Sequence, residues 1–232
     1  MSSERGEAVR VSLVALFVTA LVTSQVTASK LLAFSLPFSL PLAGGTLVLP
    51  GAALAYALTF FASDCYAELY GRRAATVVVN VGFVMNFVLL ALIWSTIFAP
   101  GLPQAAQPVD LDAFRNVLGA STGIVVASLT AYVVSQNWDV FVFHWLRDAT
   151  EGEKLWLRNI GSTASSQLID TVIFIGIGFV VFQGVPLDEV LALVVGQYFL
   201  KLVIAVVDTP FVYAVVGFAR QNDVVPTPAR AD

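Results

Sequence analysis

Apolar residues fall in long blocks along the chain, and polar segments between the blocks are short. The blocks are close to or above the roughly 20 residues that a helix needs to cross a bilayer. They predict six transmembrane helices, at Val9–Leu32, Val48–Leu69, Ala74–Ala99, Val117–Ser135, Ile160–Gln183 and Val190–Phe218. We therefore expect an all-α membrane protein: one domain over residues 1–232, a bundle of six transmembrane helices with short tails at about 1–8 and 220–232.

The second predicted helix has the least regular start. Several helix-breaking residues crowd the segment before it, namely Pro37, Pro41, Gly44, Gly45, Pro50 and Gly51. A re-entrant or partly unwound segment is the alternative at this place.

Basic residues divide unevenly between the two sides of the predicted bundle. One side has only Arg115, and the other has Arg5, Arg10, Arg72, Arg73, Arg147, Lys154, Arg158, Arg220 and Arg230. Because lysine and arginine are retained on the cytoplasmic face, both termini are predicted to be cytoplasmic. A cleaved signal peptide in the first thirty residues is the alternative, but its removal would leave an odd number of spans, against the charge pattern.

Composition agrees with lipid as the solvent and narrows the function. The chain is 58% hydrophobic and 12% charged, with a mean hydropathy of +0.84. The net charge of -4 argues against a nucleic-acid partner. Cys65 is the only cysteine and His144 the only histidine, and no catalytic or nucleotide-binding motif occurs, so we expect no enzyme activity, cofactor or metal site.

Polar side chains inside the predicted spans are the candidates for function. An ionisable group there costs several kcal/mol on insertion scales, on the order of 3, and usually faces the bundle interior. Helical spacing places such groups in stripes, which we expect to line a shared polar cavity. The candidate substrate-binding residues are Asp64, Glu68, Asn86, Tyr132, Gln136, Ser166, Gln167, Asp170 and Lys201. The alternative is structural, because polar groups also join membrane helices and an Asp170–Lys201 ion pair could serve the fold alone.

Several short motifs resemble the queuosine precursor transporter family, also called the vitamin-uptake-transporter-like family. In the first half these are Ser24-Gln25 with Lys30, Pro50-Gly51-Ala52, and Asp64 with Glu68-Leu69-Tyr70-Gly71-Arg72. In the second half they are Ala127-Ser128, Ala131-Tyr132, Ser135-Gln136 with Asp139, Leu155-Trp156-Leu157-Arg158-Asn159, Ser162-Thr163 with Ser166-Gln167 and Asp170-Thr171, and Lys201 with Thr209-Pro210 and Tyr213. The match covers roughly positions 20 to 215, and Gln25 departs from it where many relatives have Asn.

The resemblance implies a six-helix importer of 7-deazaguanine bases, either 7-cyano-7-deazaguanine or 7-aminomethyl-7-deazaguanine, salvaged for tRNA modification. For such a cargo we expect Asp170 or Glu68 to accept from two donors of the base, Gln167 or Gln136 to meet its carbonyl or ring, and Tyr132 to stack on its face. A homo-oligomer, a separate ATPase module, proton coupling through Asp64, Asp170 or Asp208, and facilitated diffusion all stay open.

Three other functions compete with this hypothesis. The same scaffold could import another vitamin or nucleobase, since few side chains set pocket specificity. The chain could be a non-transporting structural subunit of a membrane complex, with its polar stripes facing partner helices. An intramembrane hydrolase would need Ser128 or Ser166 as nucleophile and Lys201 as base.

Overall fold

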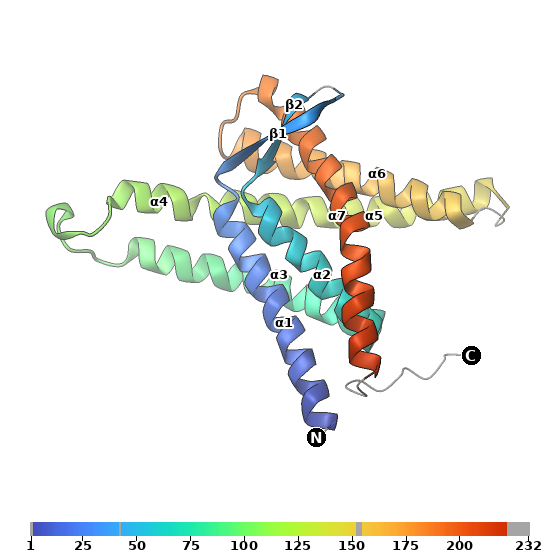
Figure 1. Cartoon of the computed structure of the whole chain (residues 1–232). Helices are drawn as coiled ribbons and strands as arrows, with labels where there is room; N and C mark the ends of the chain where they lie inside the picture. Colours follow the sequence, from blue (N-terminus) through green and yellow to red (C-terminus); the bar gives the residue numbers. More distant parts are fainter. Residues whose placement is uncertain (1, 42, 152–154, 222–232) are drawn as a thin grey trace. The chain divides into compact units, whose positions relative to one another are not determined.

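The computed structural model describes residues 2–41, 43–151 and 155–221, with side chains for 5–41, 43–151, 157 and 160–221. Lys154 and Arg230, and the side chains of Trp156 and Arg158, lie outside the described residues. The elements are α1 Ser2–Thr27, β1 Leu31–Leu40, β2 Gly44–Pro50, α2 Ala52–Tyr70, α3 Arg72–Phe98, a 3-10 turn Gln104–Ala106, α4 Leu111–Gly119, α5 Ser121–Ala149, α6 Leu155–Ile175, a π-helical segment Gly176–Val181, and α7 Leu187–Gln221 (Figure 1).

Helices lie at all six predicted positions, and five helical segments of the described chain are long and apolar enough to cross a membrane. These candidate spans are Arg5–Thr27, Arg72–Phe98, Leu111–Ala149, Ile160–Val181 and Leu187–Gln221. The helix α2 is not among them, because Asp64 and Glu68 reduce the apolar character of its second half. Its 19 residues correspond to about 28 Å, close to the roughly 30 Å of a hydrocarbon core. The mainly helical membrane fold is confirmed, and the number of spans shown is five.

The expectation of an all-α chain is wrong between α1 and α2. The first helix ends at Thr27 instead of Leu32, the second begins at Ala52 instead of Val48, and Leu31–Pro50 forms an antiparallel hairpin. The strands pair from Leu31↔Pro50 to Ser35↔Thr46, and the register shifts before Leu40↔Gly44. Pro37 lies within the shifted stretch, where its missing N–H costs no ladder hydrogen bond.

The chain divides into two compact units, which are described separately. The α1–α3 unit comprises residues 1–30, 51–118 and 200–232, and the α5–α6 unit comprises residues 31–50 and 119–199. Residues 187–199 of α7 therefore belong to the α5–α6 unit, and its remaining residues belong to the α1–α3 unit.

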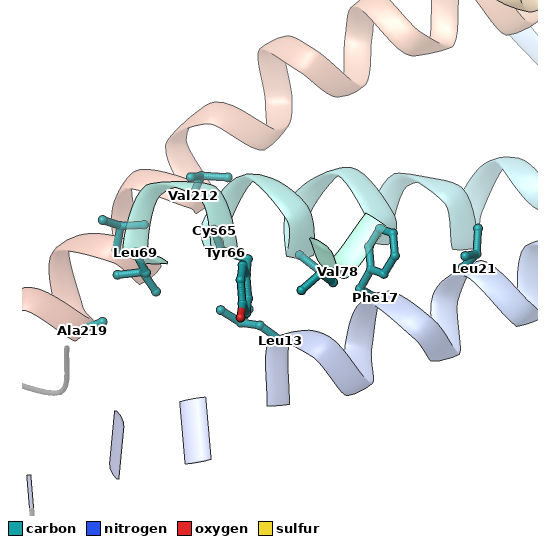
Figure 2. Close-up of a cluster of buried hydrophobic side chains, with 11 residues drawn as sticks. Leu13, Phe17, Leu21, Cys65, Tyr66, Leu69, Val78, Val212 and Ala219 are labelled. Carbon is teal, nitrogen blue, oxygen red and sulfur yellow. The ribbon is translucent and has the colours of Figure 1, made fainter. Parts of the chain in front are cut away.

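Apolar side chains from four helices form the core of the α1–α3 unit. Figure 2 shows side chains of α1, α2, α3 and the end of α7 meeting there, among them Leu13, Phe17, Leu21, Cys65, Tyr66, Leu69, Val78, Val212 and Ala219. Polar contacts lie at one end of this core: Arg10 Nε donates to the Tyr66 hydroxyl at 3.0 Å, and the Tyr70 hydroxyl donates to the Gly6 carbonyl at 3.1 Å. The unit is thus apolar along its helices and polar at this end.

Glycine determines two local features of the α1–α3 unit. Gly71 has φ of 85°, a conformation that L side chains rarely adopt, and it separates α2 from α3. Gly82 lets α3 approach α1, because a Cβ there would lie 2.6 Å from Phe17 Cε1 and 3.0 Å from Leu21 Cδ2. The α1·α3 contact therefore depends on a missing side chain.

In the α5–α6 unit, α5 and α6 pack antiparallel, and the hairpin lies against α7 (Figure 1). Gly196 of α7 faces the Val48 carbonyl, and the rings of Phe38 and Phe199 have centroids 6.4 Å apart. The helix α5 continues 14 residues beyond the predicted end at Ser135, to Ala149, so Asp139 lies inside it.

Substitution of Gly82 tests the contact between α1 and α3. We expect Gly82→Val to lower the thermal unfolding midpoint of the detergent-purified protein, because overpacking a helix contact costs about 1–3 kcal/mol. Gly217→Val in α7 is the control, since a Cβ at Gly217 would meet nothing within 4 Å. Equal midpoints for the two variants would contradict the close approach at Gly82.

Candidate functional site

Two reciprocal hydrogen bonds join α5 and α6. The Ser135 hydroxyl of α5 donates to Asp170 Oδ1 of α6 at 3.5 Å, the long limit for such a bond. One turn along, the Ser166 hydroxyl of α6 donates to Asp139 Oδ1 of α5 at 3.2 Å. Both serines are 5% exposed, and both aspartates are half-buried. We call these four residues the Ser–Asp ladder.

The sequence places the ladder residues on facing sides of the two helices. Ser135 and Asp139 are four residues apart, as are Ser166 and Asp170, so each pair occupies one helix face. Each serine hydroxyl also bonds its own helix, to the carbonyl of Tyr132 at 3.2 Å for Ser135 and of Thr163 at 3.1 Å for Ser166. These local bonds hold the hydroxyls in the interface.

A third polar contact joins α5 and α6 beside the bond between Ser166 and Asp139. Trp138 Nε1 donates to the Ser165 hydroxyl at 3.1 Å, and Ser165 in turn donates to the Gly161 carbonyl at 2.8 Å. Ser162, four residues before Ser166, is 2% exposed. Small residues at this interface allow the helices to approach closely, which is typical of membrane helix pairs.

Three more predicted site residues lie beside the ladder on the same two helices. Tyr132 and Gln167 are half-buried, and Gln136 is exposed. The unit therefore brings together five of the nine predicted residues, namely Tyr132, Gln136, Ser166, Gln167 and Asp170. Ser135 and Asp139 were missing from the predicted set, although their four-residue spacing was a signal that could have included them.

Residues 187–199 of α7 add two polar groups to the α5–α6 unit. The Tyr198 hydroxyl donates to the Ala164 carbonyl of α6 at 3.3 Å. The preceding residue, Gln197, is 7% exposed, and its Oε1 has no hydrogen-bond partner among the described residues. A buried acceptor without a partner costs about 1–3 kcal/mol, so water or a ligand that donates to it would stabilise this arrangement.

The other four predicted site residues, Asp64, Glu68, Asn86 and Lys201, belong to the α1–α3 unit. Asp64 and Glu68 lie on exposed positions of α2. Glu68 is near the end of its helix, where Arg220 Nη2 donates to its main-chain carbonyl at 3.0 Å and lies 3.7 Å from its Oε2. An exposed ion pair of this kind contributes little to stability, about 0–1 kcal/mol.

Asn86 differs from these carboxylates in its burial. It is fully buried in α3, and neither of its side-chain polar atoms has a hydrogen-bond partner among the described residues. Lys201 is half-buried in α7. Because Lys201 and Asp170 belong to different units, the Asp170–Lys201 ion pair stays a prediction.

A hollow in the α1–α3 unit lies between α2 and α7. Its volume is about 380 Å³, and it is lined by Ala57, Leu58, Phe61, Val203, Ile204, Val207, Asp208 and Phe211. A single carboxylate in an apolar lining suits a lipid chain or a neighbouring helix better than a polar base. Among the described residues, no group of three His, Cys, Asp or Glu side chains could hold a metal ion.

Comparison with known proteins is consistent with this helical architecture. Residues 50–215 match the family described as "Putative vitamin uptake transporter". A "Probable queuosine precursor transporter" of Bacillus subtilis is 32% identical over 164 residues, which are 68% of each chain. A protein of the same description from Haemophilus influenzae is 29% identical over 140 residues, 58% of this chain and 51% of that protein. No solved structure matches the chain.

The family match includes α2, α3, α5, α6 and most of α7, and so the whole Ser–Asp ladder. The candidate spans and the family together make the chain a multi-pass protein of the cell membrane and a transporter, not an enzyme. This chain belongs to the vitamin uptake transporter family, whose members include proteins named as queuosine precursor transporters.

Proposed function

We propose that this chain imports 7-deazaguanine bases across the cell membrane, as 7-cyano-7-deazaguanine or 7-aminomethyl-7-deazaguanine, for tRNA modification. One observation carries the proposal: Asp170, a carboxylate inside a candidate membrane span, faces the neighbouring helix and accepts from Ser135. It lies in the run of residues on which the family resemblance is most specific. The names of the two relatives support the same substrate class.

The chemistry of the base fits a carboxylate. The guanine-like edge of a deazaguanine has two adjacent donors, N1–H and the exocyclic amine, beside a carbonyl acceptor. A carboxylate has about four lone-pair sites, so Asp170 can accept from both donors of the base and still accept from Ser135. Charge-assisted bonds of this kind are roughly twice as strong as neutral ones, which suits selection of a mostly uncharged base.

Neighbouring polar groups supply the remaining contacts in this proposal. Gln136 or Gln167 donates to the base carbonyl, and the Tyr132 ring stacks on the flat face. Asn86 and Lys201 stay predicted site residues of the α1–α3 unit, and the Asn86 amide has no hydrogen-bond partner among the described residues. Glu68 is the second candidate for the carboxylate role, and its Oε2 lies 3.7 Å from Arg220 Nη2.

Three energy sources for uptake give different experimental results. Facilitated diffusion followed by trapping of the base in tRNA needs no coupling ion, and uptake would then survive an uncoupler. Loss of uptake on adding an uncoupler would indicate proton coupling through Asp64, Asp170 or Asp208. Copurification of an ATPase in fixed ratio would instead indicate a separate energy-coupling module.

Loss of the Asp170 charge tests the recognition chemistry. We expect Asp170→Asn to lower the initial rate of labelled 7-deazaguanine uptake by cells at least about 10-fold, because a charge-assisted hydrogen bond contributes about 1.5–3 kcal/mol. Asp188→Asn, an exposed position in the first turn of α7, is the matched control and should keep the wild-type rate at equal expression.

Three results would contradict this proposal. If uptake were unchanged in both Asp170→Asn and Glu68→Gln, no carboxylate of this pair would bind the base. If cells expressing the wild-type chain took up another nucleobase or vitamin in place of deazaguanines, the scaffold would have a different cargo. A purified protein that binds none of these molecules and copurifies with a fixed partner would be a structural subunit.

Cysteine labelling tests the predicted topology, in which both termini are cytoplasmic. Cys65 is fully buried and is the only cysteine, so the wild-type chain is a silent background for a maleimide that does not cross membranes. We expect intact cells to label Ala113→Cys in α4 and to leave Glu151→Cys unlabelled until they are lysed. The opposite pattern would reverse the topology.

A further inference from the structure

The same pentapeptide pattern occurs twice in the α5–α6 unit. Residues 135–139 of α5 read Ser-Gln-Asn-Trp-Asp, and residues 166–170 of α6 read Ser-Gln-Leu-Ile-Asp. Both segments are helical, and a small buried residue precedes each by one turn: Ala131 at 1% exposure and Ser162 at 2%. The pattern Ser-Gln-x-x-Asp is thus repeated, together with its buried serine and its half-buried aspartate.

The two copies pair with each other in reverse order. Ser135 of the first copy bonds Asp170 of the second, and Ser166 of the second bonds Asp139 of the first. Such an exchange between antiparallel helices is what a local two-fold axis produces when it passes between the helices at right angles to them. The axis relates each serine, glutamine and aspartate of one copy to the same residue type in the other.

An axis at right angles to two membrane-spanning helices lies in the membrane plane, so it exchanges the two membrane faces. Inverted repeats of transporters have this relation, and their substrate sites lie at the repeat interface. We call each hydrogen-bonded pair a rung: Ser135 with Asp170 is one, and Ser166 with Asp139 is the other. The two rungs are accordingly equivalent and lie on opposite sides of the axis. With both termini cytoplasmic, the Asp170 rung is nearer the external face and the Asp139 rung nearer the cytoplasm.

We propose that Asp139 is a second substrate-binding carboxylate, which with Ser166 forms a cytoplasm-facing half-site equivalent to the external half-site of Asp170 and Ser135. Each half-site accepts from a planar heterocycle that has two adjacent N–H donors, and the base passes from one carboxylate to the other. This inference rests on the proposed function, because it assigns the same cargo to the second rung.

The surroundings of Asp139 favour a binding role over a structural one. Ser166 is the only hydrogen-bond partner of its carboxylate among the described residues, so most of its acceptor sites remain for a ligand. An under-paired carboxylate in a membrane span is costly unless it is used.

A second group of the α5–α6 unit also points to a ligand with donors. Gln197 Oε1 is buried without a partner, and the next residue, Tyr198, contacts α6 at Ala164, two residues before Ser166. A donor on a bound base would satisfy this amide oxygen.

Sided transport assays test this assignment. Counterflow of labelled 7-deazaguanine is measured in right-side-out and inside-out membrane vesicles, which present the external and the cytoplasmic face respectively. We expect Asp170→Asn to raise the half-saturation concentration at the external face about 10-fold or more, and Asp139→Asn to do so at the cytoplasmic face. Asp148→Asn, an exposed position on the same helix as Asp139, is the matched control and should match the wild type on both faces.

The outcomes separate this inference from the proposed function. If the wild-type chain gives no counterflow of deazaguanines, the proposed function fails. If the wild type transports and Asp139→Asn keeps wild-type half-saturation on both faces, or changes both faces equally, the second half-site is wrong. Asp139→Glu, which retains the carboxylate, should restore the cytoplasmic affinity at least in part, and gel filtration of each variant checks that it folds.

Discussion

Carboxylates in hydrocarbon need hydrogen-bond donors, and the α5–α6 unit depends on how this need is met. Water supplies such donors to a soluble protein, and lipid tails do not. Asp139 and Asp170 each accept from a serine on the opposite helix, and those serines are buried. The exchange fixes how each helix is rotated toward the other, since turning one helix by one residue, about 100°, would take its serine and aspartate away from the interface. Packing and recognition therefore depend on the same four residues.

The α1–α3 unit is held together mainly by apolar packing instead of by paired carboxylates. Its core is apolar, and Gly82 allows α3 to approach Phe17 and Leu21 of α1. At one end of the unit, side-chain hydrogen bonds join the helices: Arg10 bonds the Tyr66 hydroxyl, and Arg220 bonds the main-chain carbonyl of Glu68. Arginine and tyrosine are typical of membrane interfaces. Asn86 is the exception along the helices, as a fully buried amide without partners among the described residues.

The α5–α6 unit contains two departures from regular α-helix, a π-helical segment and a β-hairpin. The π-helical segment Gly176–Val181 begins six residues after Asp170, and π-helices occur often at functional sites. Gly178 there lies against Ala127 and Ile124 of α5, where a Cβ would be 3.2 Å from the Ala127 Cβ. The hairpin Leu31–Pro50 adds non-helical backbone to the same unit, and it packs beside α7.

Sequence by itself determined the solvent, the helix positions and the family of this protein. Long apolar blocks leave few structures other than spanning helices, because every backbone group must bond within its own segment. Several helix ends differ by only a few residues from the prediction, and the largest errors are local: the hairpin between α1 and α2, and the continuation of α5 past Ser135. Proline and glycine in that hairpin marked a break but not a strand, since strand pairing depends on a partner that no local pattern specifies.

Tertiary structure alone decided which polar residues meet. Helical spacing allowed either Ser135 or Gln136, and either Ser166 or Gln167, to face the interface, and packing of α5 on α6 selected the serines. It also separated Asp64 and Glu68, exposed on α2, from the fully buried Asn86. The physical reason is that periodicity assigns a residue to a helix face, whereas the partner of that face is set by shape and hydrogen bonding between helices distant in sequence.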